Sequence, residues 1–459
     1  MDTVDIVVVG AGLAGLSAAR TLRNAGRSVV VLEARNRVAG RTFGGFLRNG
    51  VPVELGGQWV GPTQDAVLAL VDELGLETFR THDEGDGLTA YDGTVTRYAD
   101  ETFGLPEASA AEVGKLLAEI EELASTVDTH APWETDGAED LDRQTLDQWL
   151  TARTDDTLAL GFLRLLVPAL FSAESPELSL LHFLFYAKSG NGLDTLVATT
   201  GGAQESRVVG GTHRISERMA EELGDAVRLG AVVHTIVQDG DGVVVRYENA
   251  AGGGGGAVAA RHVVVAIPPM LAGRIRYSPP LPALRDALTQ QIPAGSVIKF
   301  QVGYPTAFWR DTGLSGFVLS LDGEVGVVLD NSPEDGSCGV LVAFVEGAHA
   351  RRAAELGPDG RRKLVVDRLV AYFGPAAADP FDLVEQDWTA EEFTRGCYGG
   401  RLGAGVWTQF GRALAAPVGR IHWAGAETAE TWNGYMDGAV RSGYRAAAEI
   451  LEILAAEQG

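Results

Sequence analysis

The stretch that most constrains the fold lies at residues 5–33. Residues 6–9 form a continuous apolar run, which is typical of a parallel strand covered by helices on both faces. The run ends in the pattern Gly10-x-Gly12-x-x-Gly15. In this pattern the first glycine permits a tight turn, the second lets backbone approach a pyrophosphate, and the third lets the next helix pack closely.

That helix is expected over residues 13–25, with its N-terminal N–H groups turned toward the phosphates. A second apolar strand at 28–32 ends in Glu33, where a carboxylate would hold a ribose hydroxyl. One glycine motif is weak evidence in a chain with 59 glycines, but here strand, turn, helix, strand and acid follow in order. The sequence therefore predicts a dinucleotide site, and the motif alone does not choose between NAD and FAD.

Two segments after Glu33 are expected to contact the same cofactor. Arg35, Arg37 and Arg41 lie close together, suited to a second face of a pyrophosphate or to a ribityl chain. A solvated basic loop is the alternative, but an idle arginine cluster is unusual in so acidic a chain. Residues 54–62 place three glycines and a proline around Trp59, which suits backbone lying flat against a planar ring.

The charge balance limits the partners. The chain of 459 residues carries 37 basic and 62 acidic residues, a formal net charge of −25, which disfavours nucleic acid and anionic membranes. Two cysteines are too few for a disulfide framework, no run approaches the ~18 apolar residues of a membrane span, and the first strand leaves no room for a signal peptide. We therefore expect a cytoplasmic protein, and the sequence permits a homodimer.

The texture of the chain changes twice along its length. Helical patterns at 111–126, 146–153 and 159–170 predict a helical region, with Pro168 kinking or ending the last helix. Strands are expected at 228–235, 242–248, 257–267, 296–302 and 420–424, with residues 252–256 as a hairpin tip, and helices at 359–372 and from 436 onward. Glycine-rich segments typical of nucleotide-binding domains occur at both ends and in the middle of the chain. They predict one cofactor domain built from separated pieces.

At this point seven ordered motifs carry a resemblance. They are residues 10–16, 32–35, 56–64, 296–299, 308–310 and 396–398, and residues 423–428 followed by 434–439. Over nearly its whole length the chain resembles the flavin-containing monoamine oxidases, as a bacterial soluble member. The family usually has glycine where this chain has Ala39, its mitochondrial members end in a membrane helix that is absent here, and Gly399 and Gly400 suggest a roomier cavity.

The resemblance implies FAD as the cofactor and an α/β fold. A Rossmann-type FAD-binding domain, at 1–81, 207–286 and 392–459, would be interleaved with an α+β substrate-binding domain at 82–206 and 287–391. It also implies oxidation of an amine to an imine, with molecular oxygen as the final electron acceptor.

Residue roles follow from the same resemblance. Cys397 would bind the flavin 8-methyl group through a thioether, the alternative being a buried unreactive thiol. Tyr398 and Tyr435 would form an aromatic cage for the amine, although each alone would suit core packing. Lys299 would point at the flavin N5 edge through a water, while strand alternation also permits a solvated lysine. The further expected contacts are Gln204 beside the substrate cavity, and Ala34, Gly56, Gly57, Gln58, Trp388, Val233, Glu427 and Met436 around the cofactor.

The predicted reaction is FAD-dependent oxidation of an aromatic or apolar primary monoamine, which releases aldehyde, ammonia and hydrogen peroxide. A putrescine or polyamine oxidase is an alternative that needs an acid at the far end of the cavity, with Glu324 and Asp330 as candidates better suited to exposed loops. An amino-acid oxidase would need an arginine for the carboxylate, and none is identified. A tailoring oxidase of secondary metabolism and a flavin-binding interaction protein without turnover also stay open. No metal cluster is expected.

Overall fold

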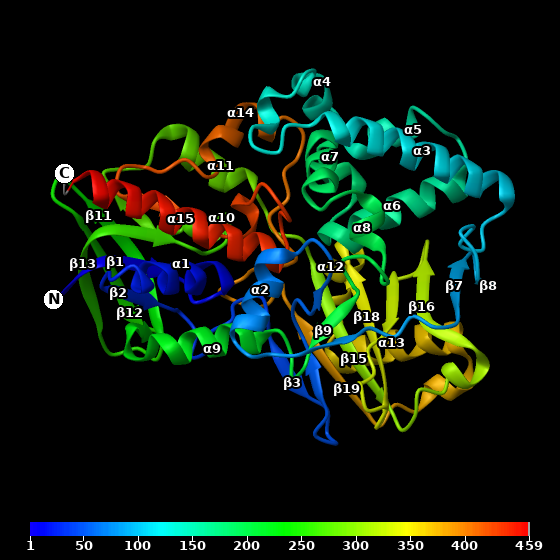
Figure 1. The fold of residues 1–459 in the computed structure, drawn as a ribbon. Coiled ribbons are helices and arrows are strands. Elements are labelled where there is room, and N and C mark those ends of the chain that lie inside the picture. The colour runs from blue at the N-terminus through cyan, green and yellow to red at the C-terminus, as the bar shows by residue number, and fades with distance from the viewer. Residues whose placement is uncertain (458–459) are drawn as a thin grey trace.

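The computed structural model describes residues 1–457 and contains two large sheets at opposite ends of the molecule (Figure 1). The eight-stranded sheet has the order β10-β2-β1-β13-β12-β11-β14, in which β10, β2, β1 and β13 run parallel, and β20 also pairs with β13. Its strands are β1 (Asp2–Val9), β2 (Val29–Leu32), β10 (Val227–Arg228), β11 (Ala231–Gln238), β12 (Val243–Asn249), β13 (Gly255–Val265), β14 (Arg276–Ser278) and β20 (Ile421–Trp423).

Strand β1 is buried on both faces, as its apolar sequence predicted. Ile6 and Val8 pack against helices α1 (Leu13–Asn24), α2 (Asp65–Glu73), α9 (His213–Leu223) and α15 (Met436–Ala456). Val7 and Val9 lie on the other face of the sheet. There they pack against residues of β11, β12 and β14 and of the short helix α10 (Pro269–Ala272). The α/β fold with a Rossmann-type core is confirmed.

The antiparallel β12–β13 pair ends in the predicted hairpin tip, but its bounds differ. The link covers residues 250–254, whereas Gly255 and Gly256 already belong to β13. Gly252 and Gly253 have φ of +78° and +80°, and a Cβ on either would meet no atom within 4 Å. The strand expected at 228–235 is also wrong as one unit, because Leu229 and Gly230 separate β10 from β11.

The seven-stranded sheet has the order β19-β15-β18-β17-β16-β7-β8 and is antiparallel except where β16 pairs with β7. Strand β15 pairs Val297 with Glu346 and Lys299 with Phe344 of β18. The strands are β7 (Asp86–Tyr91), β8 (Thr94–Tyr98), β15 (Val297–Tyr304), β16 (Leu314–Ser320), β17 (Val327–Asp330), β18 (Gly339–Glu346) and β19 (Asp382–Asp387).

Strand β15 alternates as predicted, but both of its faces are buried. Ile298 and Phe300 join the core beneath α12 (Gly347–Ala353) and α13 (Pro358–Phe373), whereas Val297 packs beside Trp388 on the opposite face. The alternative of a solvated Lys299 is wrong, since this residue is only 3% exposed.

Helices cover one side of the seven-stranded sheet (Figure 1). They form the predicted helical region and share one large apolar cluster. Pro168 does not end α6, which continues for three residues to Phe171. These helices are α3 (Glu107–Thr126), α4 (Ala138–Arg143), α5 (Leu146–Thr151), α6 (Thr157–Phe171), α7 (Leu180–Ser189) and α8 (Leu193–Val197).

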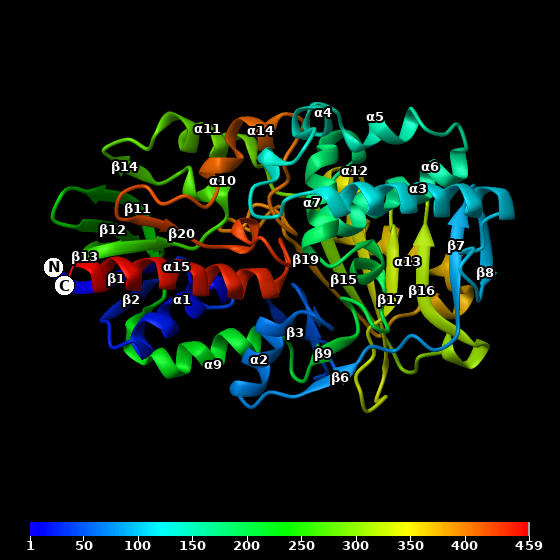
Figure 2. The same ribbon diagram turned by 45° about the horizontal axis from the view of Figure 1, so that its top comes forward.

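Small elements join the two large sheets, and Figure 2 shows them between the ends of the molecule. They are β3 (Gly44–Phe46) paired with β4 (Pro52–Glu54), and β5 (Trp59–Val60), β6 (Thr78–Arg80) and β9 (Ser206–Val208) in a three-stranded sheet. Helices α11 (Ala283–Gln291) and α14 (Val406–Phe410) contact each other on the other side of the molecule (Figure 2). No helix within residues 1–457 has the length and apolar character to cross a membrane.

The strands of the eight-stranded sheet fall within residues 1–81, 207–286 and 392–459, and those of the seven-stranded sheet within 82–206 and 287–391. We propose these ranges as the two domains. The boundary at 286 falls inside α11, and the boundary at 206 falls inside β9.

Candidate active site

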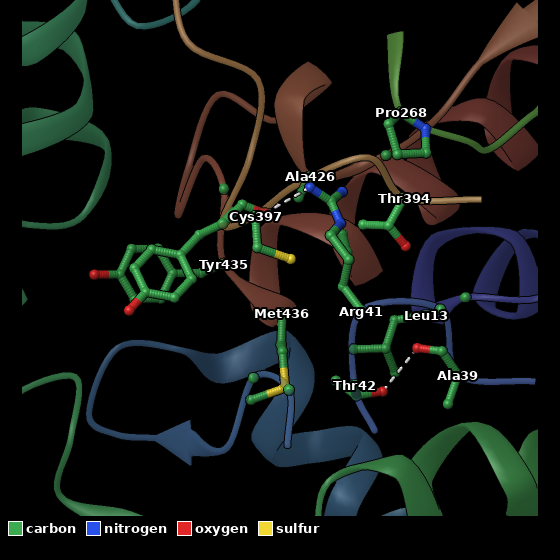
Figure 3. Close-up of a pocket in the computed structure, with 18 of the residues that line it drawn as sticks. Leu13, Ala39, Arg41, Thr42, Pro268, Thr394, Cys397, Ala426, Tyr435 and Met436 are labelled. Carbon is green, nitrogen blue, oxygen red and sulfur yellow. Dashed lines mark hydrogen bonds between the residues drawn. The ribbon is translucent and has the colours of Figure 1, made fainter. Parts of the chain in front are cut away.

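One cavity of about 240 Å³ lies where the two sheets approach each other. Segments far apart in the sequence line it, and Figure 3 shows Cys397 between Tyr435 on one side and Arg41 and Leu13 on the other. We call the part lined by Gly10, Gly12, Leu13, Glu33, Ala39 and Gly40 the glycine end. The part lined by Ala169, Leu170, Tyr186, Gln204, Phe344, Tyr398 and Tyr435 is called the aromatic end.

The glycine end depends on two very close backbone contacts. Gly10 has φ of +99° and donates its N–H to Leu32 O at 2.8 Å, so the chain turns directly from β1 into α1. A Cβ on Gly15 would lie 2.0 Å from Gly10 O. Gly12 differs, because a Cβ there would approach only the Gly40 Cα at 3.9 Å and would enter the space of the cavity. The first turn of α1 has no side-chain cap, so its N–H groups can face an anion.

Glu33 is fixed at the end of β2. Its Oε2 accepts the Ala11 N–H at 2.8 Å, and its Oε1 accepts the Arg35 N–H at 2.9 Å. The Arg35 guanidinium in turn contacts Glu391 and Thr394. The carboxylate therefore lines the cavity in one orientation, with lone pairs left for a ligand hydroxyl.

Arg41 and Glu427 form a bidentate ion pair at the middle of the cavity. Arg41 Nη1 lies 2.7 Å from Glu427 Oε1, Nη2 lies 3.0 Å from Oε2, and Nη1 also donates to Tyr398 O at 2.8 Å. Burial alone would raise the pKa of Glu427, but Arg41 holds that pKa below its ordinary value. The terminal nitrogens of Arg41 are thus occupied by protein oxygens.

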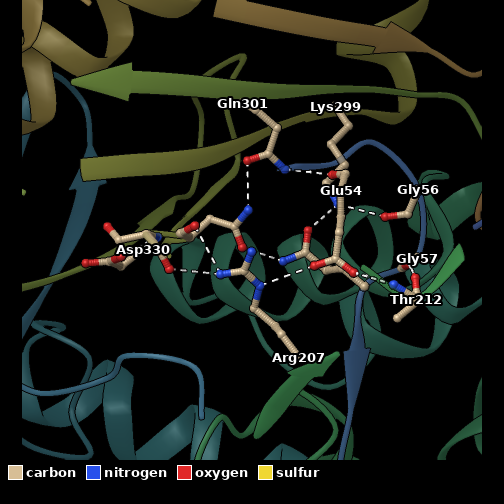
Figure 4. Close-up of polar contacts among 11 residues, drawn as sticks. Glu54, Gly56, Gly57, Arg207, Thr212, Lys299, Gln301 and Asp330 are labelled. Carbon is tan, nitrogen blue, oxygen red and sulfur yellow. Dashed lines mark hydrogen bonds and ion pairs between the residues drawn. The ribbon is translucent and has the colours of Figure 1, made fainter. Parts of the chain in front are cut away.

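Lys299 lies at the edge of a buried polar network (Figure 4). Its Nζ donates to Gly56 O at 2.7 Å and to Gln58 Oε1, and the Gln58 Nε2 donates to Asn331 Oδ1 at 2.6 Å. Burial lowers the pKa of Lys299 to about 7, although Glu54 opposes this shift. The lysine therefore lines the cavity with an amine that gives up its proton near neutral pH.

The same network connects the small elements to the seven-stranded sheet. Glu54 of β4 pairs with Arg207 of β9 at 3.2 Å, and both side chains are buried. Arg207 Nη1 donates to Asn331 O at 3.0 Å, and Gln301 Nε2 donates to Glu54 O at 2.7 Å (Figure 4). These bonds position the strand that carries Lys299 against the segment that carries Gln58.

Cys397 lines the cavity between its two ends, and its sulfur is visible in Figure 3. Burial raises the pKa of this thiol to about 12, while Arg41 and Lys299 partly oppose the shift. Trp388 shares an apolar cluster with Cys397 and donates its indole N–H to Leu55 O at 2.9 Å.

Aromatic rings form most of the aromatic end. Tyr435 packs on Trp432 and on Tyr186, with ring centroids at 4.9 and 5.8 Å. Tyr398 packs edge-on against Phe344 at 6.4 Å. Burial raises the pKa of both Tyr398 and Tyr435, so both rings carry neutral hydroxyls at physiological pH.

The structure brings together most of the residues selected from the sequence. Those lining the cavity are Gly10, Gly12, Glu33, Arg35, Arg41, Gly56, Gly57, Gln58, Trp59, Gln204, Lys299, Cys397, Tyr398, Tyr435 and Met436. Gly15, Ala34, Val233, Trp388 and Glu427 are not among the residues that line it. Glu324 and Asp330 do not line it either, and Asp330 is buried against Arg310 and Trp309 rather than exposed in a loop.

Sequence reasoning missed much of the aromatic end. Leu170 of α6, Tyr186 of α7 and Phe344 of β18 line it, and Glu346 lies directly behind Tyr398. A helical region rich in apolar residues was expected, but nothing in its local pattern distinguishes residues of a cavity wall from core residues.

A nucleotide-binding core that shares one cavity with an aromatic chamber is typical of a cofactor-dependent oxidoreductase. The chain belongs to the flavin-containing amine oxidoreductase family, whose sequence model matches residues 13–451. It is therefore an oxidoreductase that acts on amines.

Individual relatives agree with this assignment. The chain is 37% identical to the flavin-containing amine oxidase B of Sus scrofa over 98% of this chain and 86% of that protein. It is similar to a putrescine oxidase bound to putrescine, with TM-score 0.94, 37% identity and coverage of 98% of this chain and 99% of the other. It is also similar to cyclohexylamine oxidase from Brevibacterium oxydans IH-35A, with TM-score 0.93, 35% identity and the same coverage.

Membership of this family implies FAD, and the cavity fits such a group. The Trp59 indole N–H and Gln204 Oε1 are buried without a hydrogen-bond partner in the described part of the chain, and both residues line the cavity. Space that a Cβ would fill lies over Gly12, beside the uncapped start of α1. Within residues 1–457 no group of three or more His, Cys, Asp or Glu side chains is arranged to hold a metal ion.

Proposed function

We propose that this enzyme oxidises an aromatic or otherwise apolar primary monoamine to its imine. The imine would hydrolyse to aldehyde and ammonia, and oxygen would leave as hydrogen peroxide. The composition of the aromatic end carries the proposal. It consists of aliphatic and aromatic side chains with Gln204, and among the described residues that line the cavity, Glu33 at the glycine end is the sole carboxylic acid.

The glycine end would hold the nucleotide part of FAD. The first turn of α1 and Gly12 would face the pyrophosphate, and Glu33 would accept a ribose hydroxyl. Gly56, Gly57, Trp59 and Met436 would lie against the flavin ring system. Val233 of β11 lies outside the cavity wall, and its contact with the adenine is proposed from the family resemblance alone. When bound, FAD supplies the capacity to accept two electrons from the carbon next to the amine nitrogen and to pass them to oxygen.

The protein would prepare the amine for this reaction. Tyr398 and Tyr435 would bind the amine nitrogen between aromatic faces, which attract cations and tolerate neutral amines. Removal of water at this buried site lowers the pKa of an ammonium group, as it does for a buried lysine. The substrate would therefore reach the form with a free lone pair, which oxidation requires.

Lys299 would act in the second half of the reaction, in which oxygen is reduced. Its Nζ is held by Gly56 O and Gln58, and its pKa of about 7 lets the amine exchange a proton near neutral pH. We propose that Nζ holds a water beside the flavin and supplies a proton during reduction of oxygen.

Cys397 would attach the cofactor covalently. A thioether would form when the sulfur replaces a hydrogen of the flavin 8-methyl group, the two released electrons passing to oxygen. The position of the sulfur in the cavity wall supports this, and Arg41 and Lys299 partly oppose the rise in the thiol pKa that burial causes. Acid precipitation tests it: yellow colour should stay with the pellet of the wild-type protein and move to the supernatant for Cys397→Ala. Colour released from both proteins would contradict the thioether.

A diamine oxidase is the second candidate, because the putrescine oxidase is similar over the whole chain. A diamine needs an acid for its distant ammonium group. Glu324 pairs with Arg368, and Asp330 pairs with Arg310, and neither residue lines the cavity. The monoamine is therefore the first choice.

A substrate panel read by hydrogen peroxide release distinguishes the candidates. Phenethylamine, tyramine and cyclohexylamine represent monoamines, putrescine and spermidine represent polyamines, and leucine and phenylalanine represent amino acids. We expect the highest kcat/KM for a monoamine. A preference for putrescine would support the second candidate, and absence of peroxide with every amine would refute turnover altogether.

A further inference from the structure

Glu346 is a buried carboxylic acid directly behind the aromatic end. It is the last residue of β18, is 5% exposed, and pairs across the sheet with Val297. The Tyr398 hydroxyl donates to Glu346 Oε1 at 2.7 Å, and the Ser172 hydroxyl lies 3.5 Å from the same oxygen. Glu346 does not line the cavity itself, so its contact with bound substrate would pass through the Tyr398 ring.

No basic group compensates a charge on Glu346. Within residues 1–457, no Lys, Arg or His nitrogen lies within 4.0 Å of its carboxyl oxygens. The titratable groups that face it are Tyr398 and, through space, Glu174, which itself accepts the Ala348 N–H at 2.6 Å. Burial raises the pKa of Glu346 to about 8, and the two hydroxyl contacts only partly oppose this. The acid is thus neutral at pH 7 and loses its proton in mildly alkaline solution.

The state of this acid changes the Tyr398 ring. Because the hydroxyl points at Glu346, an amine in the cavity would meet the face of the ring rather than its hydroxyl. A hydrogen bond to an ionised acceptor is stronger than one to a neutral acceptor, and it draws the phenol proton toward the carboxylate. Negative charge on the ring then increases, and the face attracts a cation more strongly.

We propose that Glu346 is a positioning residue of the amine site, which fixes the Tyr398 ring from behind and, by releasing its proton, strengthens binding of the ammonium form of the substrate. The proposal rests on the proposed function, because it takes an amine to be bound against Tyr398.

The first test compares the pH dependence of KM for FAD-loaded wild-type enzyme and Glu346→Gln with one amine. The amide keeps the size of the side chain and an acceptor for the Tyr398 hydroxyl, but it cannot ionise. Titration of the free substrate is the same for both proteins and cancels in their ratio. We expect the KM of the variant divided by that of wild type to be close to one below pH 7 and to rise about threefold to tenfold above pH 8, because only the wild type gains affinity for the ammonium form.

A second variant keeps the test decisive if Glu346→Gln folds poorly. Tyr398→Phe retains the ring and removes the hydroxyl that joins it to Glu346. The alkaline gain in binding should disappear in Tyr398→Phe, and adding Glu346→Gln to that variant should change nothing further. Glu385→Gln is the matched control. It removes an acid of β19 that pairs with Arg361 of α13, and it should keep the wild-type profile.

Thermal unfolding gives a readout that requires no turnover. A folded-state pKa raised above the ordinary value of 4.5 makes Glu346 stabilising at low pH, and this stability is lost as pH rises through about 8. The melting temperature of Glu346→Gln minus that of wild type should therefore increase from pH 5 to pH 8. The same difference for Glu385→Gln should not increase in this way.

The outcomes separate this proposal from the proposed function. If the best amine of the panel is a diamine, the proposed function fails, and the same comparison with that diamine still tests Glu346. A flat ratio of the two KM values, or a melting difference that does not widen with pH, would overturn the role of Glu346 while leaving monoamine oxidation intact.

Discussion

The two ends of the cavity are built by different means. At the glycine end the backbone forms the binding surface, because Gly10, Gly12 and the first turn of α1 present N–H groups and open space. At the aromatic end side chains form the cavity wall. They come from helices α6 and α7, strand β18 and the loops around Tyr398 and Tyr435. The comparison teaches that the glycine end is specified over one short stretch of chain, whereas the aromatic end is assembled from segments distributed over the fold.

The largest expected effect tests the backbone part of this comparison. Gly15→Ala would place a Cβ 2.0 Å from Gly10 O, a backbone atom that cannot move aside without distorting the turn. We expect the bound FAD per protein, measured from the flavin absorbance, to fall at least tenfold. Gly114→Ala in α3 is the control, since its Cβ would meet no atom within 4 Å, and it should keep full flavin content. Normal flavin content in Gly15→Ala would show that the tight turn is dispensable.

The second prediction concerns the junction between the two ends. Arg207→Met would leave Glu54 as a buried acid without its ion pair, which costs about 3–5 kcal/mol. Urea unfolding of the FAD-loaded protein measures this loss. Arg143→Met removes an arginine from an exposed pair with Glu139 and should have little effect. Equal stability of the two variants would mean that the network in Figure 4 does not hold the small elements to the seven-stranded sheet.

The pH dependence of Lys299 supplies a graded effect with a defined sign, which reaches its full size only across several pH units. Its folded-state pKa of about 7 lies below the ordinary 10.5, so the unfolded chain binds its proton first as pH falls. As pH is lowered from 10.5 to 7, the free energy of unfolding of wild type should therefore decrease relative to that of Lys299→Met. The expected change over this range is at most about 5 kcal/mol, at about 1.4 kcal/mol per unit of pKa shift.

Urea titrations at several pH values measure this difference. Lys363→Met, on the exposed side of α13 beside Asp367, is the matched control and should run parallel to wild type. A constant difference between wild type and Lys299→Met would contradict a depressed lysine pKa.

Much of the glycine end could be predicted from the sequence, because its determinants are local. The strand, the turn, α1 and Glu33 lie within 33 residues, and each element limits the conformation of the next. The start of α15 at Met436 and the alternation of side chains along β15 were also predicted, although burial of both faces of β15 was not. Family resemblance located Lys299, Cys397, Tyr398 and Tyr435, which all line the cavity.

The rest depends on tertiary contacts that no local pattern encodes. Tyr186 and Leu170 occupy helices that are apolar on most sides, so periodicity does not reveal which residues face the cavity. Glu346 ends a strand that is otherwise entirely apolar, and its importance depends on Tyr398, which is 52 residues away. Arg41 was expected to face phosphate or ribityl groups, but its partner Glu427 lies at the opposite end of the chain.

The glycine tip between β12 and β13 offers a use that the cavity does not constrain. The tip lies at the end of the molecule opposite the seven-stranded sheet (Figure 1), and Gly252 and Gly253 have open space around them. A peptide inserted there would cost mainly loop-closure entropy, which grows slowly with length. The tip is therefore a natural point for tethering the enzyme to a solid support in an amine sensor, with the reactive chamber left open to solution.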